Sequence, residues 1–175
     1  RFDRVRRAKV TGVAEKTIVI FINDNGGARQ NSADNGALRG TKGTPFEGGV
    51  RVPFAMRWPA RLDGGAVYEH PVSALDVVPT VRAAAGLAGA PPRPLDGVDL
   101  VPYLDGTTDG RPHDRLHWRQ GNQIAIREGD WKLVRTRAGE IFLFDLAQEP
   151  GETTDLMKVE PAMARGLLAA HDAWA

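Results

Sequence analysis

The hydrophobic residues gather in one uninterrupted run near the start of the chain and in several short segments nearer its end. Thr17–Ile22 consists of apolar or β-branched residues, which predicts a strand buried on both faces of a mostly parallel sheet. A second strand is predicted over Val52–Pro59, with Pro53 near its start and Pro59 at its end. These two segments indicate an α/β fold for the first part of the chain.

A helix and a long connection are predicted next. The helix should begin with Asp76 as its N-cap, run to Ala85 and end at Gly86. Residues 87–113 are rich in Pro, Gly and Asp and predict a wrapping connection with a short turn near Val101–Leu104. We therefore place a domain boundary here, which divides the chain into residues 1–113 and residues 114–175.

The second part of the chain predicts a small α+β subdomain. Four short candidate strands are joined by hairpin-like connections that contain glycine; they are Leu116–Arg119, Gln123–Arg127, Trp131–Arg135 and Ile141–Phe144. A final helix over Ala162–Trp174 has apolar residues at Met163, Leu167, Ala170 and Trp174, so it should cover one face of a four-stranded antiparallel sheet. It lacks the basic polar face of a membrane-surface helix.

Candidate chemistry stands where the first predicted strand ends. Asp24 and Asn25 are hard oxygen donors of the type that Ca²⁺ or Mg²⁺ takes, and two adjacent donors from one turn can serve one cation. The alternative is a plain turn, since Asp-Asn-Gly is good turn chemistry in itself. The chain supplies its own control, because Asp34-Asn35-Gly36 repeats the tripeptide with no strand before it. We interpret this second copy as a turn only.

A glycine-rich segment follows, over Arg39–Arg51, with glycine at positions 40, 43, 48 and 49. Such glycines let the backbone approach a ligand closely. Lys42 within it can neutralise an oxyanion, although a lysine in a loop is more often solvated. The spacing and the following helix of a phosphate-binding P-loop are both absent from this segment.

These motifs carry a resemblance. Together with a series of later motifs in the same order, the chain closely resembles the formylglycine-dependent, arylsulfatase-like sulfatases of the alkaline phosphatase superfamily, over what corresponds to their C-terminal portion. The matching stretches are Asp24–Gly26, Leu38–Phe54, Leu75–Thr80, Leu95–Leu100, Asp130–Leu133, Leu143–Leu146 and Glu149–Glu152.

The resemblance implies a fold and a mechanism. Residues 1–113 would be the edge of the catalytic α/β domain, with its mostly parallel sheet, and residues 114–175 the small C-terminal subdomain. Asp24 and Asn25 match two ligands of a divalent cation, usually Ca²⁺, with Mg²⁺ as the alternative, and Lys42 matches a lysine that binds a sulfate oxygen. A formylglycine made from Cys or Ser would attack the sulfate ester, which would be an aryl or carbohydrate sulfate.

The nucleophile itself is missing from this sequence. The modification motif, Cys or Ser followed by x-Pro-x-Arg, does not occur, and neither does the early Asp-Asp pair that completes the family's metal site. We therefore expect the chain to be part of a longer enzyme and to be inactive alone. The family also implies a periplasmic or secreted location. Two alternatives stay open: a phosphonate or phosphate ester hydrolase of the same superfamily, and a non-catalytic binding module.

Composition and charge limit the classes of binding partner that the sequence predicts. The 175 residues are 42% hydrophobic and 26% charged, which is typical of a globular protein. A formal net charge of +1 gives no reason to expect nucleic acid, and the basic stretch Arg1–Ala14 has a single aromatic residue, Phe2, in place of the several interleaved aromatic residues that would stack bases. No apolar run approaches the roughly 20 residues that span a membrane. The absence of cysteine excludes disulfides and thiolate metal sites within the sequence.

Overall fold

A computed structural model describes residues 2–87 and 89–175, with side chains from Val5 onward. The chain divides into two units by its internal contacts. The first unit consists of the residues up to Ile22 together with Phe54–His113, and the second unit consists of Asn23–Pro53 together with Asp114–Ala175. The change of unit at residues 113 and 114 coincides with the predicted boundary, whereas the segment 23–53 groups with the C-terminal residues.

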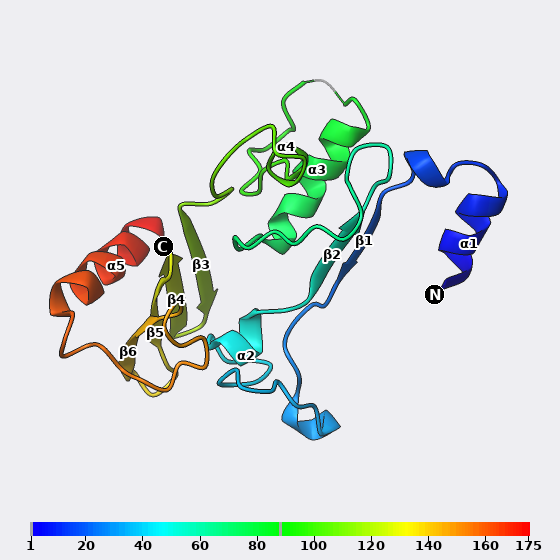
Figure 1. Cartoon of the computed structure of the whole chain (residues 1–175). Coiled ribbons are helices and arrows are strands. Elements are labelled where there is room, and N and C mark those ends of the chain that lie inside the picture. Colours follow the sequence, from blue (N-terminus) through cyan, green and yellow to red (C-terminus); the bar gives the residue numbers. More distant parts are fainter. Residues whose placement is uncertain (1, 88) are drawn as a thin grey trace. The chain divides into compact units, whose positions relative to one another are not determined.

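The first unit contains a two-stranded sheet (Figure 1). Helix α1 (Phe2–Val10) and a 3₁₀ turn (Ala14–Lys16) precede strand β1 (Val19–Ile22), which pairs with β2 (Phe54–Arg57). The two strands are antiparallel, and Phe21 of β1 is 49% exposed. The strand is thus present as predicted, but its predicted burial on both faces is wrong within the described residues, because β2 is its one neighbour there.

The helices of the first unit follow the prediction, with Asp76 at the N-cap position of α3 (Val77–Ala84). A 3₁₀ turn (Ala74–Asp76) leads into α3, and α4 is the predicted short turn at Val101–Leu104. Asp76 is the N-cap residue of α3, although its side chain makes no capping hydrogen bond to that helix. Ser73 caps the preceding turn, and the Asp76 carboxylate accepts from the Ser73 amide at 2.7 Å in a capping box. The same buried carboxylate accepts from the Val98 amide at 2.9 Å and lies 2.8 Å from His113 Nε2. It therefore ties the wrapping connection to the helix.

The second unit is built on a four-stranded antiparallel sheet in chain order. Its strands are β3 (Arg115–Gln120), β4 (Gln123–Glu128), β5 (Trp131–Arg135) and β6 (Ile141–Asp145). Helix α5 (Pro161–Trp174) lies on one face (Figure 1). Leu167 and Ala164 of α5 pack there against Ile126, Leu133 and Leu143. The α/β class, the four-stranded sheet and its helical cover are confirmed.

The opposite face of this sheet is covered by the glycine-rich segment. Phe46 packs against Ala125, Val134 and Phe144, and the short helix α2 (Glu47–Val50) follows it directly. A 3₁₀ turn at Arg29–Asn31 is the other helical piece of the segment 23–53. The sheet thus has a helix on one face and the candidate chemistry on the other. In the part of the chain that the structure describes, no helix is long and apolar enough to cross a membrane.

Candidate functional site

The turn after β1 carries the two predicted metal ligands. Asp24 is exposed and Asn25 half-buried. The Asn25 side-chain amide donates to the Gly26 carbonyl at 2.9 Å, and within residues 5–87 and 89–175 no donor pairs with the Asp24 carboxylate. The carboxylate and the Asn25 carbonyl oxygen are therefore available to a ligand.

Helix α2 fixes the position of that turn. The Gly26 amide donates to the Gly49 carbonyl at 3.0 Å, across the top of the short helix. A side chain on Gly26 would lie 2.7 Å from the Gly48 carbonyl carbon and 3.1 Å from Gly49 Cα. Only glycine permits so close an approach between two backbones. The Asp24–Gly26 turn thus packs directly against the backbone of helix α2 at Gly48 and Gly49.

Lys42 lies on a loop that is bonded to the same turn. Its backbone amide donates to the Gly27 carbonyl at 3.0 Å. Its side chain is exposed, and among the described residues no carboxylate lies within ion-pair distance of it. The structure thus brings the three predicted site residues into one unit, with the Lys42 loop bonded to the turn that holds Asp24 and Asn25.

The second Asp-Asn-Gly is a turn, as predicted, but its asparagine has a further role that the sequence did not indicate. Asp34 Oδ1 accepts from the Gly36 amide at 2.8 Å, which closes an Asx turn. Asn35 Oδ1 accepts from the Gly27 amide at 2.7 Å, and its amide donates to the Gly40 carbonyl at 3.0 Å. Asn35 thereby joins the turn after β1 to the Lys42 loop.

The oxygen donors of Asp24 and Asn25 are of the type that a hard cation binds, but they are fewer than such a cation needs. Ca²⁺ takes six to eight oxygen ligands, and the turn offers the side chains of Asp24 and Asn25. Among the described residues no group of three or more His, Cys, Asp or Glu side chains is placed to hold a metal. The two residues therefore fit part of a cation site, and the remaining ligands would have to come from outside this turn.

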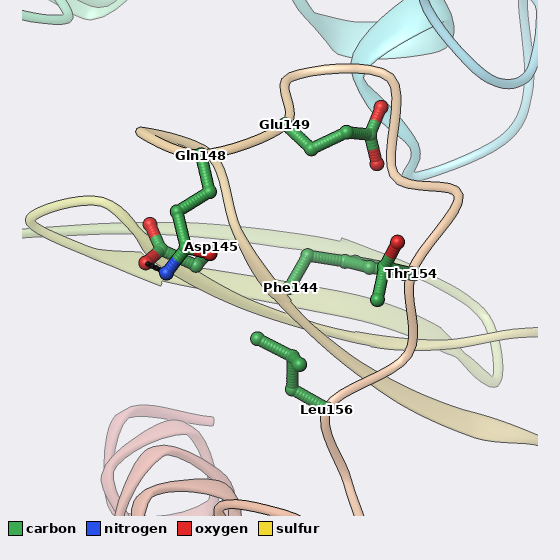
Figure 2. A pocket seen from close by; sticks show the side chains of 6 residues that line it. All are labelled: Phe144, Asp145, Gln148, Glu149, Thr154 and Leu156. Atoms are coloured by element: carbon green, nitrogen blue, oxygen red, sulfur yellow. Dashed lines mark hydrogen bonds between the residues drawn. The ribbon is translucent and has the colours of Figure 1, made fainter.

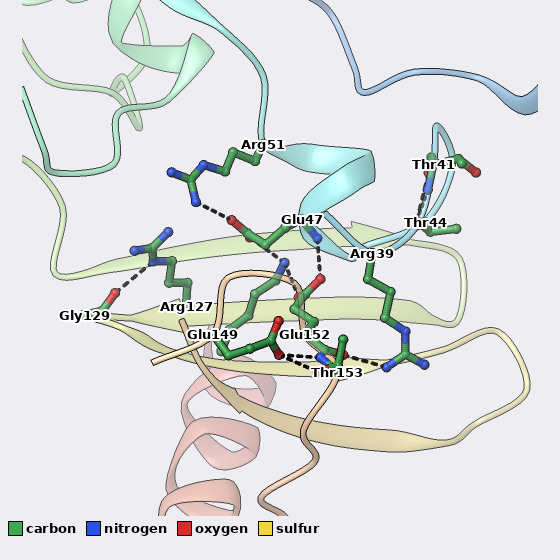
Figure 3. A network of polar contacts seen from close by, with 11 residues as sticks. Arg39, Thr41, Thr44, Glu47, Arg51, Arg127, Gly129, Glu149, Glu152 and Thr153 are labelled. Carbon is green, nitrogen blue, oxygen red and sulfur yellow. Dashed lines mark hydrogen bonds and ion pairs between the residues drawn. The ribbon is translucent and has the colours of Figure 1, made fainter. Parts of the chain in front are cut away.

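A buried charge cluster joins strand β5 to helix α2 and to the loop after β6, and no pattern in the sequence predicted it. Lys132 of β5 is fully buried, with its Nζ 2.7 Å from Glu47 Oε1 and 2.9 Å from Glu152 Oε1. Figure 3 shows the two glutamates of this cluster. Burial raises the pKa of Glu152, and the Lys132 charge opposes that rise. The one signal in the sequence is positional: Lys132 lies two residues from the core residue Val134, on the same face of β5.

A small cavity beside the sheet carries no candidate chemistry. It encloses about 70 Å³ and is lined by Phe144, Asp145, Gln148, Glu149, Thr154 and Leu156 (Figure 2). Asp145 accepts from the Ala147 amide at 3.0 Å, and Glu149 accepts from the Thr153 amide at 2.6 Å, a bond that lowers the pKa of Glu149. Both carboxylates close turns, and the cavity is far smaller than the roughly 300–1,000 Å³ of a ligand pocket.

A family model and a curated relative both match the chain. The family model described as Sulfatase matches residues 5–87, which include Asp24, Asn25 and Lys42. The steryl-sulfatase of Mus musculus is 33% identical over 93% of this chain and 32% of its own length. The chain spans about a third of the length of the first curated relatives that it matches.

Solved structures extend the likeness to the whole fold. The crystal structure of Ps i-CgsB, also solved in complex with k-i-k-neocarrahexaose, is 30% identical to this chain with a TM-score of 0.87. That alignment covers 97% of this chain and 39% of Ps i-CgsB. The phosphonate monoester hydrolase of Agrobacterium radiobacter is 26% identical with a TM-score of 0.72, over 98% of this chain and 38% of the hydrolase.

Proposed function

The chain belongs to the sulfatase family, and on that premise we propose that it forms the C-terminal part of a sulfuric ester hydrolase acting on aryl or carbohydrate sulfates. Asp24 and Asn25 serve as two ligands of a divalent cation, Ca²⁺ in the first place and Mg²⁺ as the alternative. Lys42 binds an oxygen of the sulfate group. The nucleophile, a formylglycine, and the remaining ligands come from outside this sequence.

The chemistry of these side chains suits their proposed roles. A bound divalent cation supplies electrostatic stabilisation of the charge that develops on the sulfate oxygens. The Asp24 carboxylate and the Asn25 carbonyl oxygen hold hard cations well, and the Lys42 ammonium offers three donors to an anionic oxygen. Since no nucleophile of this family is present in the sequence, the chain by itself should not turn over a sulfate ester.

One observation carries the proposal. The Lys42 amide is bonded to the Gly27 carbonyl at 3.0 Å, and Asn35 joins the same two loops a second time. The Asp24 carboxylate, the Asn25 carbonyl oxygen and the Lys42 ammonium group are thereby held on two adjoining loops, and among the described residues none of these three groups has a hydrogen-bond or ion-pair partner. Asp24 and Asn25 are therefore available to a cation, and Lys42 is available to an anionic group beside it.

The substrate class is supported by the neighbours. The Mus musculus relative is a steryl-sulfatase, and Ps i-CgsB was solved with a carbohydrate. A sulfate ester of a small molecule or of a glycan is therefore the proposed substrate. We also propose that the protein is periplasmic or secreted, where it would meet such sulfate esters outside the cytoplasm.

A second candidate is phosphonate monoester hydrolysis, because the Agrobacterium radiobacter hydrolase shares the fold over 98% of this chain at 26% identity. The same cation and lysine would then meet a phosphonate in place of a sulfate. The choice between the two substrates lies outside the residues described here, so it calls for an assay on the protein as its natural source makes it.

The test combines one peptide map with two substrates. The map of the natural protein should show a Cys or Ser converted to formylglycine ahead of this sequence, and purified protein should hydrolyse an aryl sulfate faster than an aryl phosphonate monoester. The reverse preference selects the second candidate. A natural chain that begins at Arg1 and binds no Ca²⁺ would refute both and favour a non-catalytic binding module.

A further inference from the structure

We propose that the buried cluster of Lys132, Glu47 and Glu152 positions the two loops that carry Asp24, Asn25 and Lys42. These three side chains would touch neither cation nor substrate, so they are positioning residues. The identity of the positioned site rests on the proposed function. The positioning itself rests on contacts within the second unit, and it can be tested without any substrate.

The first contact joins the sheet to helix α2. Lys132 on β5 is 0% exposed and Glu47 is 2% exposed, and their charged atoms are 2.7 Å apart. Glu47 is the first residue of α2. Because a buried ion pair tolerates little change in geometry, the pair fixes the start of α2 at one place on the sheet.

The second contact joins Glu152, in the loop after β6, to both ends of the segment Arg39–Glu47. Glu152 Oε2 accepts from the Glu47 amide at 2.6 Å, while the Glu152 carbonyl accepts from Arg39 Nη1 at 3.0 Å (Figure 3). Glu152 has a left-handed backbone with φ 57°, a conformation that is strained for a non-glycine residue. Its hydrogen bonds hold it there, and the segment from Arg39 to Glu47 is thereby clamped at its two ends.

The third contact passes from α2 to the site. The Gly48 amide donates to the Arg39 carbonyl at 2.7 Å, and the Gly49 carbonyl accepts from Gly26 at 3.0 Å. The Gly27 carbonyl then accepts from Lys42. A continuous set of hydrogen bonds and backbone contacts therefore leads from the buried cluster to each of the two loops.

The charge balance argues for a role in geometry rather than in stability alone. The cluster holds two carboxylates against one buried ammonium, and Glu47 Oε2 has no hydrogen-bond partner. Its neighbour Arg51 is 3.7 Å away with a side chain that is 56% exposed. Apolar side chains of similar volume commonly stabilise a core as well as a buried ion pair does. The directional bonds of the cluster add a single defined position for α2.

Amide hydrogen exchange of this chain tests the proposal, read at Gly26 and Lys42 and compared with Leu167 in α5. The first variant is Lys132→Met, which keeps the length of the side chain and removes its charge. Leu133→Ala is the matched control, because Leu133 is also 0% exposed but faces α5. Leu133→Ala leaves a cavity in the core, and Lys132→Met leaves two buried carboxylates without their charge partner, so both variants lose stability.

We expect Lys132→Met to accelerate exchange at Gly26 and Lys42 at least about tenfold more than at Leu167, and Leu133→Ala to show the opposite order. Equal acceleration at both places in Lys132→Met would overturn the proposal.

If Lys132→Met does not fold, a pair of variants at Glu47 decides. Glu47→Gln keeps an oxygen that accepts from Lys132 and should leave exchange at Gly26 within about twofold of the parent, whereas Glu47→Ala should accelerate it at least about tenfold. Equal exchange in the two variants would overturn the proposal. These readouts use neither metal nor substrate, so they stand even where sulfate-ester hydrolysis by the natural protein fails, and that second failure would refute the proposed function alone.

Discussion

The substitution Gly26→Ala tests the backbone contact on which the site depends. The added Cβ would lie 2.7 Å from the Gly48 carbonyl carbon and 3.1 Å from Gly49 Cα, and both of these are main-chain atoms. The Gly48 carbonyl oxygen would lie closer still to the added Cβ. Since non-bonded carbon atoms pack at about 3.5–4.0 Å, the two turns must separate by at least about 1 Å. The separation would also break the hydrogen bond from the Gly26 amide to the Gly49 carbonyl.

The expected cost follows from these two effects. Overpacking contributes about 1–3 kcal/mol, and a buried amide left without an acceptor contributes about 1–3 kcal/mol. We therefore expect Gly26→Ala to lower the free energy of unfolding by about 4 kcal/mol, a large part of the roughly 5–15 kcal/mol of a native domain. Asp24 and Asn25 would move with the turn, so cation affinity in the natural protein should fall as well.

Urea denaturation followed by tryptophan fluorescence measures the change. Three of the four tryptophans, at positions 118, 131 and 174, lie in the second unit. With a slope of about 2 kcal/mol per molar urea, the midpoint should fall by about 2 M. The control is Gly166→Ala, on the exposed side of α5 with no atom within 4 Å of the added Cβ, which should stabilise the protein by about 0.5–1 kcal/mol. An unchanged midpoint for Gly26→Ala would refute the close backbone contact between Gly26 and helix α2.

Two further predictions concern the pair His117 and His171 and the bonds by which Asn35 joins two loops. His117 and His171 face each other with their Nδ1 atoms 3.4 Å apart, and burial lowers the pKa of both below 6.5. Their contribution to stability is therefore present above about pH 6.5 and lost as the pH falls, because the unfolded state takes up protons first; urea midpoints at pH 7.5 and 5.5 should differ less in His117→Gln than in the parent. Asn35→Ala removes the bonds to the Gly27 amide and the Gly40 carbonyl and should cost about 1–3 kcal/mol in the same urea assay; a loss below about 0.5 kcal/mol would contradict the role of Asn35 as a clamp.

The sequence predicted the elements of the second unit well because their signals are local. Glycine-containing connections separate the four strands, and Pro161 with its apolar spacing marks α5. The signal for β1 was also local, but its burial depends on neighbouring strands. A run of apolar residues does not state how many neighbours a strand has, which is why the half-exposed Phe21 was not foreseen.

The cap of α3 and the buried cluster show a second limit. Asp76 is the N-cap residue of α3 as predicted, yet its carboxylate bonds back to the Ser73 amide, and Ser73 caps the turn before the helix. The cluster joins residues 47, 132 and 152. No periodicity links charges so far apart in sequence, so their pairing needed the fold. The candidate residues Asp24, Asn25 and Lys42 came from a resemblance of motifs, and their roles remain a prediction.

The central claim is that Asp24 helps to hold the cation of a sulfate-ester hydrolase, and one comparison of variants in the natural protein tests it most directly. Asp24→Ala and Asp34→Ala change the same residue in two copies of the same tripeptide, of which only the first follows a strand. Hydrolysis of an aryl sulfate in the presence of Ca²⁺ should be abolished by Asp24→Ala and nearly unchanged by Asp34→Ala. Equal activity in the two variants would contradict the account.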